Sequence, residues 1–261
     1  MLSTVICLFL LILPGTPPPQ AAPDQPAVAP VQPVQEQYKR PIEVLMASLT
    51  KYYVGVYWKG PHWEKSSDQD IQDQMAKNTA NINELVKNGK LVGMAAVHEE
   101  SDCKMVVFFK TESEQEARAL AESSYAVKRG LLKGEIYQVW GTRGLGEGLK
   151  EALQQDPNTK ANQENFYLTI LSKGKKWTEK PEGDVSRLMD EHASKVMLFR
   201  DKGVLRFYGA VSGNTTIRNI SIVKGESAKA VEEKLAAGNL IKMSWFSAAV
   251  YPCTVAEGTL P

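Results

Sequence analysis

Short runs of apolar residues alternate with polar segments along the chain, and one pattern of runs occurs twice. The first run, YYVGVYW at residues 52–58, predicts a strand. Residues 68–88 carry apolar side chains at helical spacing, with acidic residues in the first turn and Gly89 after the last, which predicts an amphipathic helix. The pattern then predicts a strand, a polar hairpin, a strand, a short helix and a last strand, at residues 91–97, 98–104, 105–109, 113–122 and 134–140. The order β-α-β-β-α-β is that of a ferredoxin-like unit.

The same pattern returns later in the chain. Residues 166–254 align with residues 52–140 at a constant offset and without a gap. Identical pairs include Tyr53/Tyr167, Lys59/Lys173, Gly60/Gly174, Trp63/Trp177, Gly89/Gly203 and Tyr137/Tyr251. Chance rarely keeps one register over so long a stretch, so the sequence indicates a tandem duplication of one module.

A single sheet with helices on one face leaves its other face bare, and two such units can cover each other. We therefore expect an α+β fold of two ferredoxin-like repeats whose sheets face one another, an intramolecular pseudo-dimeric α+β barrel. The expected division is repeat 1, a linker and repeat 2, at residues 40–142, 143–164 and 165–261. The linker should hold a short helix near residues 145–155, stopped before Pro157, and another short helix is expected at 40–49.

The beginning of the chain has the pattern of an exported protein. An apolar run from Val5 to Leu13 is too short to span a bilayer but has the length of a signal-peptide core. We expect a signal peptide at residues 1–22, export to the periplasm or the extracellular space, and no membrane span in the mature chain. Residues 23–39, rich in Pro, Ala and Gln, predict an extended, solvated tether. The rival interpretation is a lipid anchor at Cys7, but apolar residues continue past it, where a lipoprotein signal would end.

Composition narrows the classes of function. The chain has 261 residues, 43% hydrophobic content and a formal net charge of +1, without a Lys/Arg-rich run, which argues against nucleic-acid binding. With 3 histidines and no Cys/His spacing typical of zinc, no metal or cofactor is expected. Cys103 and Cys253 either pair or are small buried hydrophobes. The second interpretation is favoured, because the aligned positions hold Ile217 and Val139.

Several short motifs accompany the duplicated pattern. They are KGPHW, NTANI, GKLVGMAAV, EQEARALAESSYAVKRGLL and EIYQVW, in chain order. In this order they resemble the YCII-related family, over the whole first copy and more weakly over the second. The resemblance implies a dimeric α+β barrel whose active pair is a helix His and the Asp of an Asp-Pro motif.

The sequence departs from the family pattern at both positions of that pair. The His position holds Asn78 in the first copy and His192 in the second, and the Asp position holds Ser124 and Gly238. The resemblance therefore implies a degenerate active site. A buried Asn78 must be hydrogen-bonded, so it is either the remnant of a site or a structural link to Ser124, and the link is favoured. Of the family's Gly-Pro turn, the second copy keeps only Gly209.

His192 lies on the apolar face of its predicted helix and should point at the sheet. A neutral imidazole there can act as a general acid or base, which makes His192 the catalytic candidate. No carboxylate partner is evident, because Asp190 and Glu191 lie on other faces. The favoured interpretation is a buried His satisfied by one hydrogen bond.

Lys59 and Lys173 each follow the first strand of their copy, with Gly next and Trp63 or Trp177 nearby. As ligand-binding candidates they would form a cleft rim in which the ammonium meets an anion and the indole supplies a flat wall. The structural interpretation is that the Gly relaxes a turn with unusual dihedral angles while the Trp caps the core. Their presence in both copies favours the structural interpretation.

Two functions of different classes follow. The first is an exported, non-catalytic module that binds a small ligand or a partner, with a degenerate family active site. The second is a lyase- or hydrolase-like enzyme that uses His192 as general acid/base. The missing partner of His192 favours the first. The sequence names no ligand and leaves further oligomerisation open.

Overall fold

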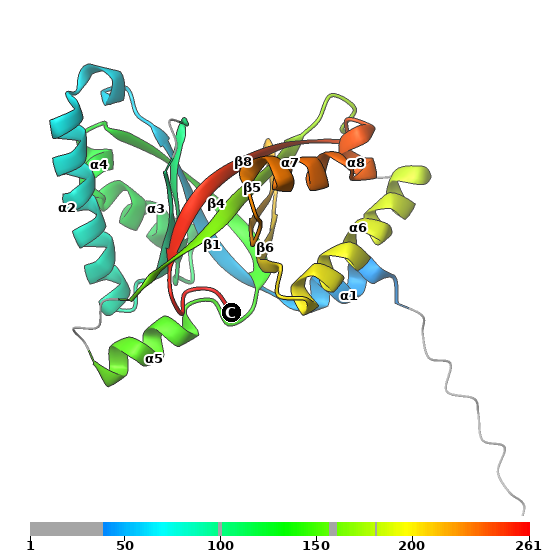
Figure 1. Ribbon diagram of the computed structural model, residues 1–261, viewed down its shortest axis with the longest axis horizontal. Helices are drawn as coiled ribbons and strands as arrows, with labels where there is room; N and C mark the ends of the chain where they lie inside the picture. Colours follow the sequence, from blue (N-terminus) through cyan, green and yellow to red (C-terminus); the bar gives the residue numbers. More distant parts are fainter. Residues whose placement is uncertain (1–38, 99–100, 157–160, 181) are drawn as a thin grey trace, which may run out of the picture. The chain divides into compact units, whose positions relative to one another are not determined.

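The computed structural model describes residues 39–98, 101–156, 161–180 and 182–261 (Figure 1). The predicted signal peptide and all but the last residue of the predicted tether lie outside the described residues. The predicted leading helix is present as α1 (Pro41–Ala47).

The first half has the predicted order of elements. They are β1 (Leu49–Lys59), a short 3₁₀ turn (Trp63–Lys65), α2 (Asp68–Lys87), β2 (Leu91–Val97), β3 (Cys103–Phe109), α3 (Glu114–Ser123), α4 (Tyr125–Lys128) and β4 (Leu132–Thr142). The hydroxyls of Ser67 and Ser113 accept backbone N–H groups and begin α2 and α3. Gly89, at a φ of 69°, follows the end of α2 as expected. Only the short helix α4 was not predicted.

The second half repeats this order after the predicted linker helix, α5 (Glu147–Gln155). Its elements are β5 (Gln163–Lys173), α6 (Asp184–Asp201), β6 (Leu205–Val211), β7 (Ile217–Val223), α7 (Ala228–Ala236), α8 (Asn239–Lys242) and β8 (Phe246–Ala256). The predicted end of the linker at residue 164 is wrong. Gln163 and Glu164 already pair with Ala256 and Val255 of β8, so tertiary pairing extends the strand beyond its apolar run.

All eight strands form one closed barrel in the order β1-β3-β2-β8-β5-β7-β6-β4, and every strand pair is antiparallel. The expected α+β barrel is present, and the two halves also join edge to edge, so that the two facing sheets form one continuous sheet. β2 pairs with β8 at Val97↔Cys253, and β4 pairs with β6 at the aligned positions, Val139↔Val211. Closure leaves no unpaired sheet edge in the barrel. The fold is a mixed α+β fold with an antiparallel sheet.

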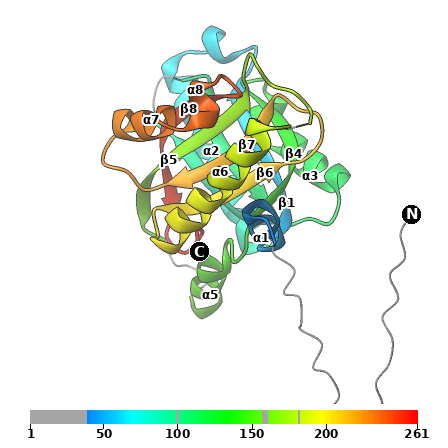
Figure 2. The ribbon, with the colours of Figure 1, turned by 90° about the vertical axis from the view of Figure 1, so that its right-hand side faces the viewer.

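Helices cover the outside of the barrel on two opposite sides. Helices α2, α3 and α4 lie on one side of the strands, and α6, α7 and α8 lie on the other (Figures 1 and 2). The barrel interior is an apolar core built by both halves, with Val54, Phe108, Phe207 and Ile220 fully buried. The two cysteines, Cys103 and Cys253, are free and buried in this core, which confirms the favoured interpretation.

The layers between the barrel and its helices differ in the two halves. In the first half this layer is one continuous cluster. In the second half it is split into two clusters, one around Leu45, Val196 and Tyr208 and the other around Leu188 and Trp245. Residues of both clusters line a cavity.

The glycines after the first strand of each half serve a different purpose from the predicted one. Neither Gly60 nor Gly174 has a positive φ, so the expectation of unusual dihedral angles is wrong. A Cβ at Gly60 would lie 2.3 Å from the carbonyl oxygen of Gly130, and a Cβ at Gly174 would lie 2.2 Å from that of Ser244. Glycine is needed because two backbone segments approach closely.

The turn that lies against Gly60 in the first half, and against Gly174 in the second, differs between the halves in one residue with a positive φ. The first half has Gly130 at a φ of 70°, whereas the aligned Ser244 has a φ of 60°. The left-handed region costs a residue with a side chain roughly 1 kcal/mol or more, and glycine avoids this cost. We predict that Ser244→Gly raises the free energy of unfolding by about 0.5 to 1 kcal/mol in urea denaturation. In the reverse change, Gly130→Ser, stability should fall, since the new Cβ would lie 2.8 Å from Nδ1 of His62.

The matched control is Ser247→Gly on the exposed face of β8, which should lower stability because a strand residue gains backbone freedom. Equal effects of Ser244→Gly and Ser247→Gly would show that the positive φ carries no strain.

Candidate functional site

In the first half, the side chains of Asn78 and Ser124 fill the space at the two positions of the expected active pair. Asn78 and Ser124 are buried between α2 and the α3–α4 junction. The Ser124 hydroxyl donates a hydrogen bond to Oδ1 of Asn78 at 2.6 Å, and Nδ2 of Asn78 lies 3.8 Å from Sδ of Met105. The predicted structural link between these two residues is confirmed.

The aligned position in the second half is a cavity of about 360 Å³. His192 of α6 and Gly238, immediately before α8, occupy the places of Asn78 and Ser124, and both line the cavity. The apolar walls come from α6, the sheet and the α7–α8 segment, and include Leu171, Leu188, Val196, Leu205, Leu240 and Phe246. These side chains belong to both of the separate clusters of the outer layer.

Differences in side-chain volume explain why this aligned place is packed in the first half and hollow in the second. The strands of the two halves pair in the same register, since Tyr57 faces Met105 in the first half and the aligned Leu171 faces Asn219 in the second. At aligned places of the outer face, Tyr57, Met105, Val107 and Phe109 give way to Leu171, Asn219, Ser221 and Val223. The side chain of Ser124 is lost altogether at Gly238. The same backbone therefore encloses a packed layer in one half and a cavity in the other.

The sheet side of the cavity is polar but satisfied. Nδ2 of Asn219 donates to the Gly209 carbonyl at 2.9 Å, and the Ser221 hydroxyl donates to Oδ1 of Asn219 at 2.7 Å. The candidate Gly209 does not line the cavity. A Cβ there would lie 2.6 Å from Val139, so its role is close packing of the barrel.

The imidazole of His192 is one of several polar groups on the cavity wall, where Glu191, Lys195, Lys234 and Asn239 also lie. Among the described residues it forms no hydrogen bond, and its ring lies 6.4 Å from the ring of Tyr208, centroid to centroid. Burial, with a smaller contribution from the charge of Lys195, lowers the pKa of His192 from 6.5 to about 4. The ring is therefore neutral near pH 7, and the prediction that a protein hydrogen bond satisfies it is wrong.

The two carboxylates that precede His192 in the sequence form ion pairs with arginines. Asp190 pairs with Arg40 at 2.8 Å, and Glu191 pairs with Arg187. No carboxylate within the described part of the chain orients the imidazole, so the arrangement lacks the partner that general acid/base catalysis needs.

The Lys and Trp candidates form two similar surface clusters outside this cavity. Lys59 pairs with Glu64 at 2.8 Å and lies 5.8 Å from the ring centre of Trp63. In the second half, Lys173 pairs with Glu179 at 2.8 Å and lies 5.7 Å from the ring of Trp177.

Trp177 also packs against Trp245 and Phe246, with ring centres 4.8 and 5.5 Å apart. Trp63 packs against the outer core of the first half. Both tryptophans cap a core, as the structural interpretation predicts.

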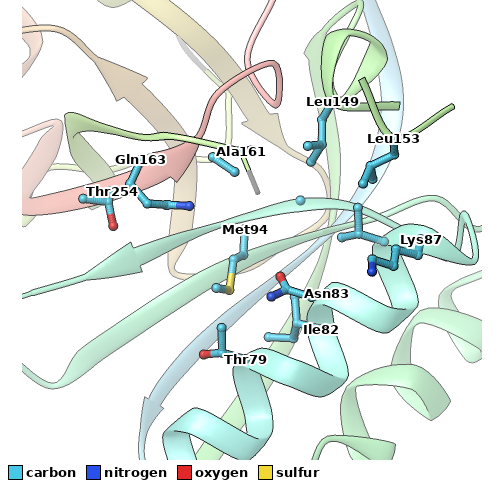
Figure 3. Close-up of a pocket in the computed structure, with 13 residues that line it drawn as sticks. Thr79, Ile82, Asn83, Lys87, Met94, Leu149, Leu153, Ala161, Gln163 and Thr254 are labelled. Carbon is cyan, nitrogen blue, oxygen red and sulfur yellow. The ribbon is translucent and has the colours of Figure 1, made fainter. Parts of the chain in front are cut away.

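A larger cavity, of about 710 Å³, lies between α2 and β2 of the first half, helix α5, and strands β5 and β8, and was not predicted from the sequence (Figure 3). Residues Thr79, Ile82, Asn83 and Lys87 of α2 form one side, and Leu149 and Leu153 of α5 lie opposite them. The sequence signal that points to it is the unequal spacing of α1 and α5 from the first strands of the two copies, which breaks the repeat.

None of the described helices has the length and apolar composition that crossing a bilayer requires. Within the described residues, no group of three or more His, Cys, Asp and Glu side chains is placed to hold a metal ion.

No family model matches the chain, and no curated protein matches it. Among solved structures, a point mutant of chlorite dismutase from Candidatus Nitrospira defluvii aligns with a TM-score of 0.50 at 11% identity, over 83% of this chain and 96% of that chain. The complex of the same enzyme with imidazole aligns with a TM-score of 0.49 at 12% identity, over 83% of this chain and 95% of that chain. At this identity the likeness shows the fold alone.

Because the pKa of His192 is lowered in the folded protein, we predict that the free energy of unfolding depends on pH. Between pH 6.5 and about 4 the unfolded chain binds a proton on this residue that the folded chain does not, so stability must fall as the pH falls through this window. The loss should be roughly 2 to 3 kcal/mol and should level off below pH 4. His192→Asn, which copies Asn78, removes this component.

Urea denaturation of both proteins at several pH values gives the comparison, because other titrating groups contribute equally and cancel in the difference. Identical pH dependences would mean that the His192 ring is not shielded in the folded protein.

Proposed function

We propose that the protein binds a small molecule in the His192 cavity and does not turn it over. The observation that carries this proposal is the neutral imidazole at the cavity wall, without a hydrogen bond to any described residue. Small-molecule sites combine apolar walls with a few polar groups that orient the ligand. Here much of the wall is aliphatic or aromatic, Lys195 and Lys234 add charge to it, and we propose His192 as the orienting group.

The chemistry of the cavity defines the class of ligand. Asn219 and Ser221 use their polar atoms within the protein, whereas a neutral imidazole nitrogen can accept a hydrogen bond. A volume of about 360 Å³ suits a compact ligand. We infer a largely apolar, preferably aromatic molecule with one hydrogen-bond donor directed at His192.

We further propose that the two halves are ferredoxin-like repeats of the YCII-related type, produced by duplication. The motifs of the first copy and the equal strand registers of both halves support this proposal. In this view, Asn78 and Ser124 close the old site of the first half, and the second half keeps an open but altered one.

A lyase- or hydrolase-like enzyme would need a carboxylate or hydroxyl that orients the imidazole. Asp190 and Glu191 pair with Arg40 and Arg187 instead. Binding without turnover is therefore the function that the site supports best.

The test closes the second cavity with the residues of the first half. The triple variant His192→Asn, Asn219→Met and Gly238→Ser copies Asn78, Met105 and Ser124. Gly238 has a φ of −68° and a ψ of 134°, close to the values of Ser124, so serine fits its backbone. We predict that 2-naphthol, observed by ligand-detected NMR, binds the wild-type protein and that the triple variant reduces its affinity at least tenfold.

His192→Asn alone is the control that keeps the cavity but removes the imidazole. It should weaken 2-naphthol by up to about tenfold, the value of one hydrogen bond, and leave naphthalene unchanged. Equal affinity of the wild-type protein and the triple variant for 2-naphthol would show that the ligand binds elsewhere. Turnover of a substrate that depends on His192 would contradict the proposal that the protein binds without catalysis.

A further inference from the structure

Helix α1 covers an apolar surface on the second half. Leu45 is fully buried in a cluster with Ala193, Val196 and Tyr208 of α6 and β6. The helix is also held by polar contacts. Arg40 pairs with Asp190 at 2.8 Å, and Arg200 donates to the Ser48 hydroxyl at 2.8 Å.

The aligned surface on the first half has no such cover. Its residues are Thr79, Ile82 and Met94, at the places of Ala193, Val196 and Tyr208, and all three line the large cavity. Helix α5 precedes β5 as α1 precedes β1, but Leu149 and Leu153 form the far wall of the cavity and do not fill it (Figure 3). The cavity is thus the uncovered counterpart of the place where α1 packs.

The uncovered surface lacks the polar contacts that hold a helix. Ala76 stands at the place of Asp190, and Val86 stands at the place of Arg200. A peptide helix like α1 would find neither its ion pair nor its hydrogen bond here. The surface favours an apolar occupant without a backbone of its own.

The charge on the described lining of the cavity comes from one residue. Of the described residues that line it, Lys87 is the single charged side chain, and it replaces the acidic Asp201 of the second half. Its neighbours along the cavity include Ile82, Val86 and Met94. The lining also includes the uncharged polar residues Thr79, Asn83, Gln163 and Thr254. A mainly apolar lining with a cation at one place is complementary to a molecule with an alkyl chain and an anionic head.

We propose that this cavity binds a single-chain anionic amphiphile, such as a fatty-acid carboxylate. The alkyl chain lies between α2, β2 and α5, and the carboxylate accepts a hydrogen bond from Nζ of Lys87. The volume, about 710 Å³, falls among those of known ligand sites, roughly 300–1,000 Å³. This site is separate from the His192 cavity.

The experiment titrates the protein with dodecanoate by isothermal calorimetry, below the micelle concentration, and compares dodecyltrimethylammonium, which has the same chain and the opposite charge. Dodecanoate should bind with one equivalent and the cation at least tenfold more weakly. Lys87→Gln should weaken dodecanoate about tenfold. Lys150→Gln, on α5 but outside the cavity lining, should leave the affinity unchanged.

Two further measurements locate the binding. Leu153→Glu, at a partly exposed wall position, should also weaken dodecanoate, whereas the triple variant that closes the His192 cavity should bind it as the wild type does. Loss of binding only in the triple variant, or equal binding of both amphiphiles, would overturn the proposal. So would failure of dodecanoate to bind while a peptide of residues 40–50 does.

Discussion

The structure depends on the closure of one sheet by two short strand pairings between the halves. β2 meets β8 and β4 meets β6 at aligned positions, so each half supplies the edge that the other lacks. Closure directs one face of every strand into a common interior, which both halves fill with fully buried apolar side chains. A change of volume there would disturb both halves at once. The faces under the helices are less constrained, and the His192 cavity lies on the outer face of the second half.

The outer layer of the second half shows how far the residues under the helices can differ while the barrel stays closed. Its outer layer has exchanged Met105 and Phe109 of the first half for Asn219 and Val223, and the layer divides into two clusters around a cavity. Loss of large buried side chains without collapse typically costs about 2 to 5 kcal/mol each. The closed barrel holds the backbone in place, because the strand registers of the two halves remain the same. A ligand that fills the space would recover part of the lost contacts.

Most elements follow from the sequence because each depends on local pattern. The spacing of apolar residues in α2 and the limits of β2 need only their own residues, and the aligned pattern in the second half predicts α6 and β6 in the same way. The hydrogen bond between Asn78 and Ser124 is also expected, because a buried amide must be hydrogen-bonded. Edge-to-edge closure is not expected, because pairing such as Val97↔Cys253 joins residues far apart whose patterns fit a facing pair of sheets equally well.

The cavities escape prediction for a related reason. A cavity is a deficit of volume among residues on different elements, such as His192, Asn219 and Gly238, and their proximity appears only with the fold. A turn glycine is similarly ambiguous, since Gly60 could serve an unusual dihedral angle or a close approach, and only the position of the Gly130 carbonyl decides.

The first half serves as an internal reference for the meaning of His192. At the same place on the same backbone, Asn78 obtains a hydrogen bond from Ser124 and is fully buried. The first half therefore shows how a polar residue at this position can be satisfied within the protein. In the second half, a change of Gly238 to serine would supply the corresponding hydroxyl. His192 has instead an apolar cavity, a neutral ring and no bonding partner among the described residues. A purely structural role explains the arrangement of the first half, whereas the ligand that we propose for the cavity would explain the arrangement of the second.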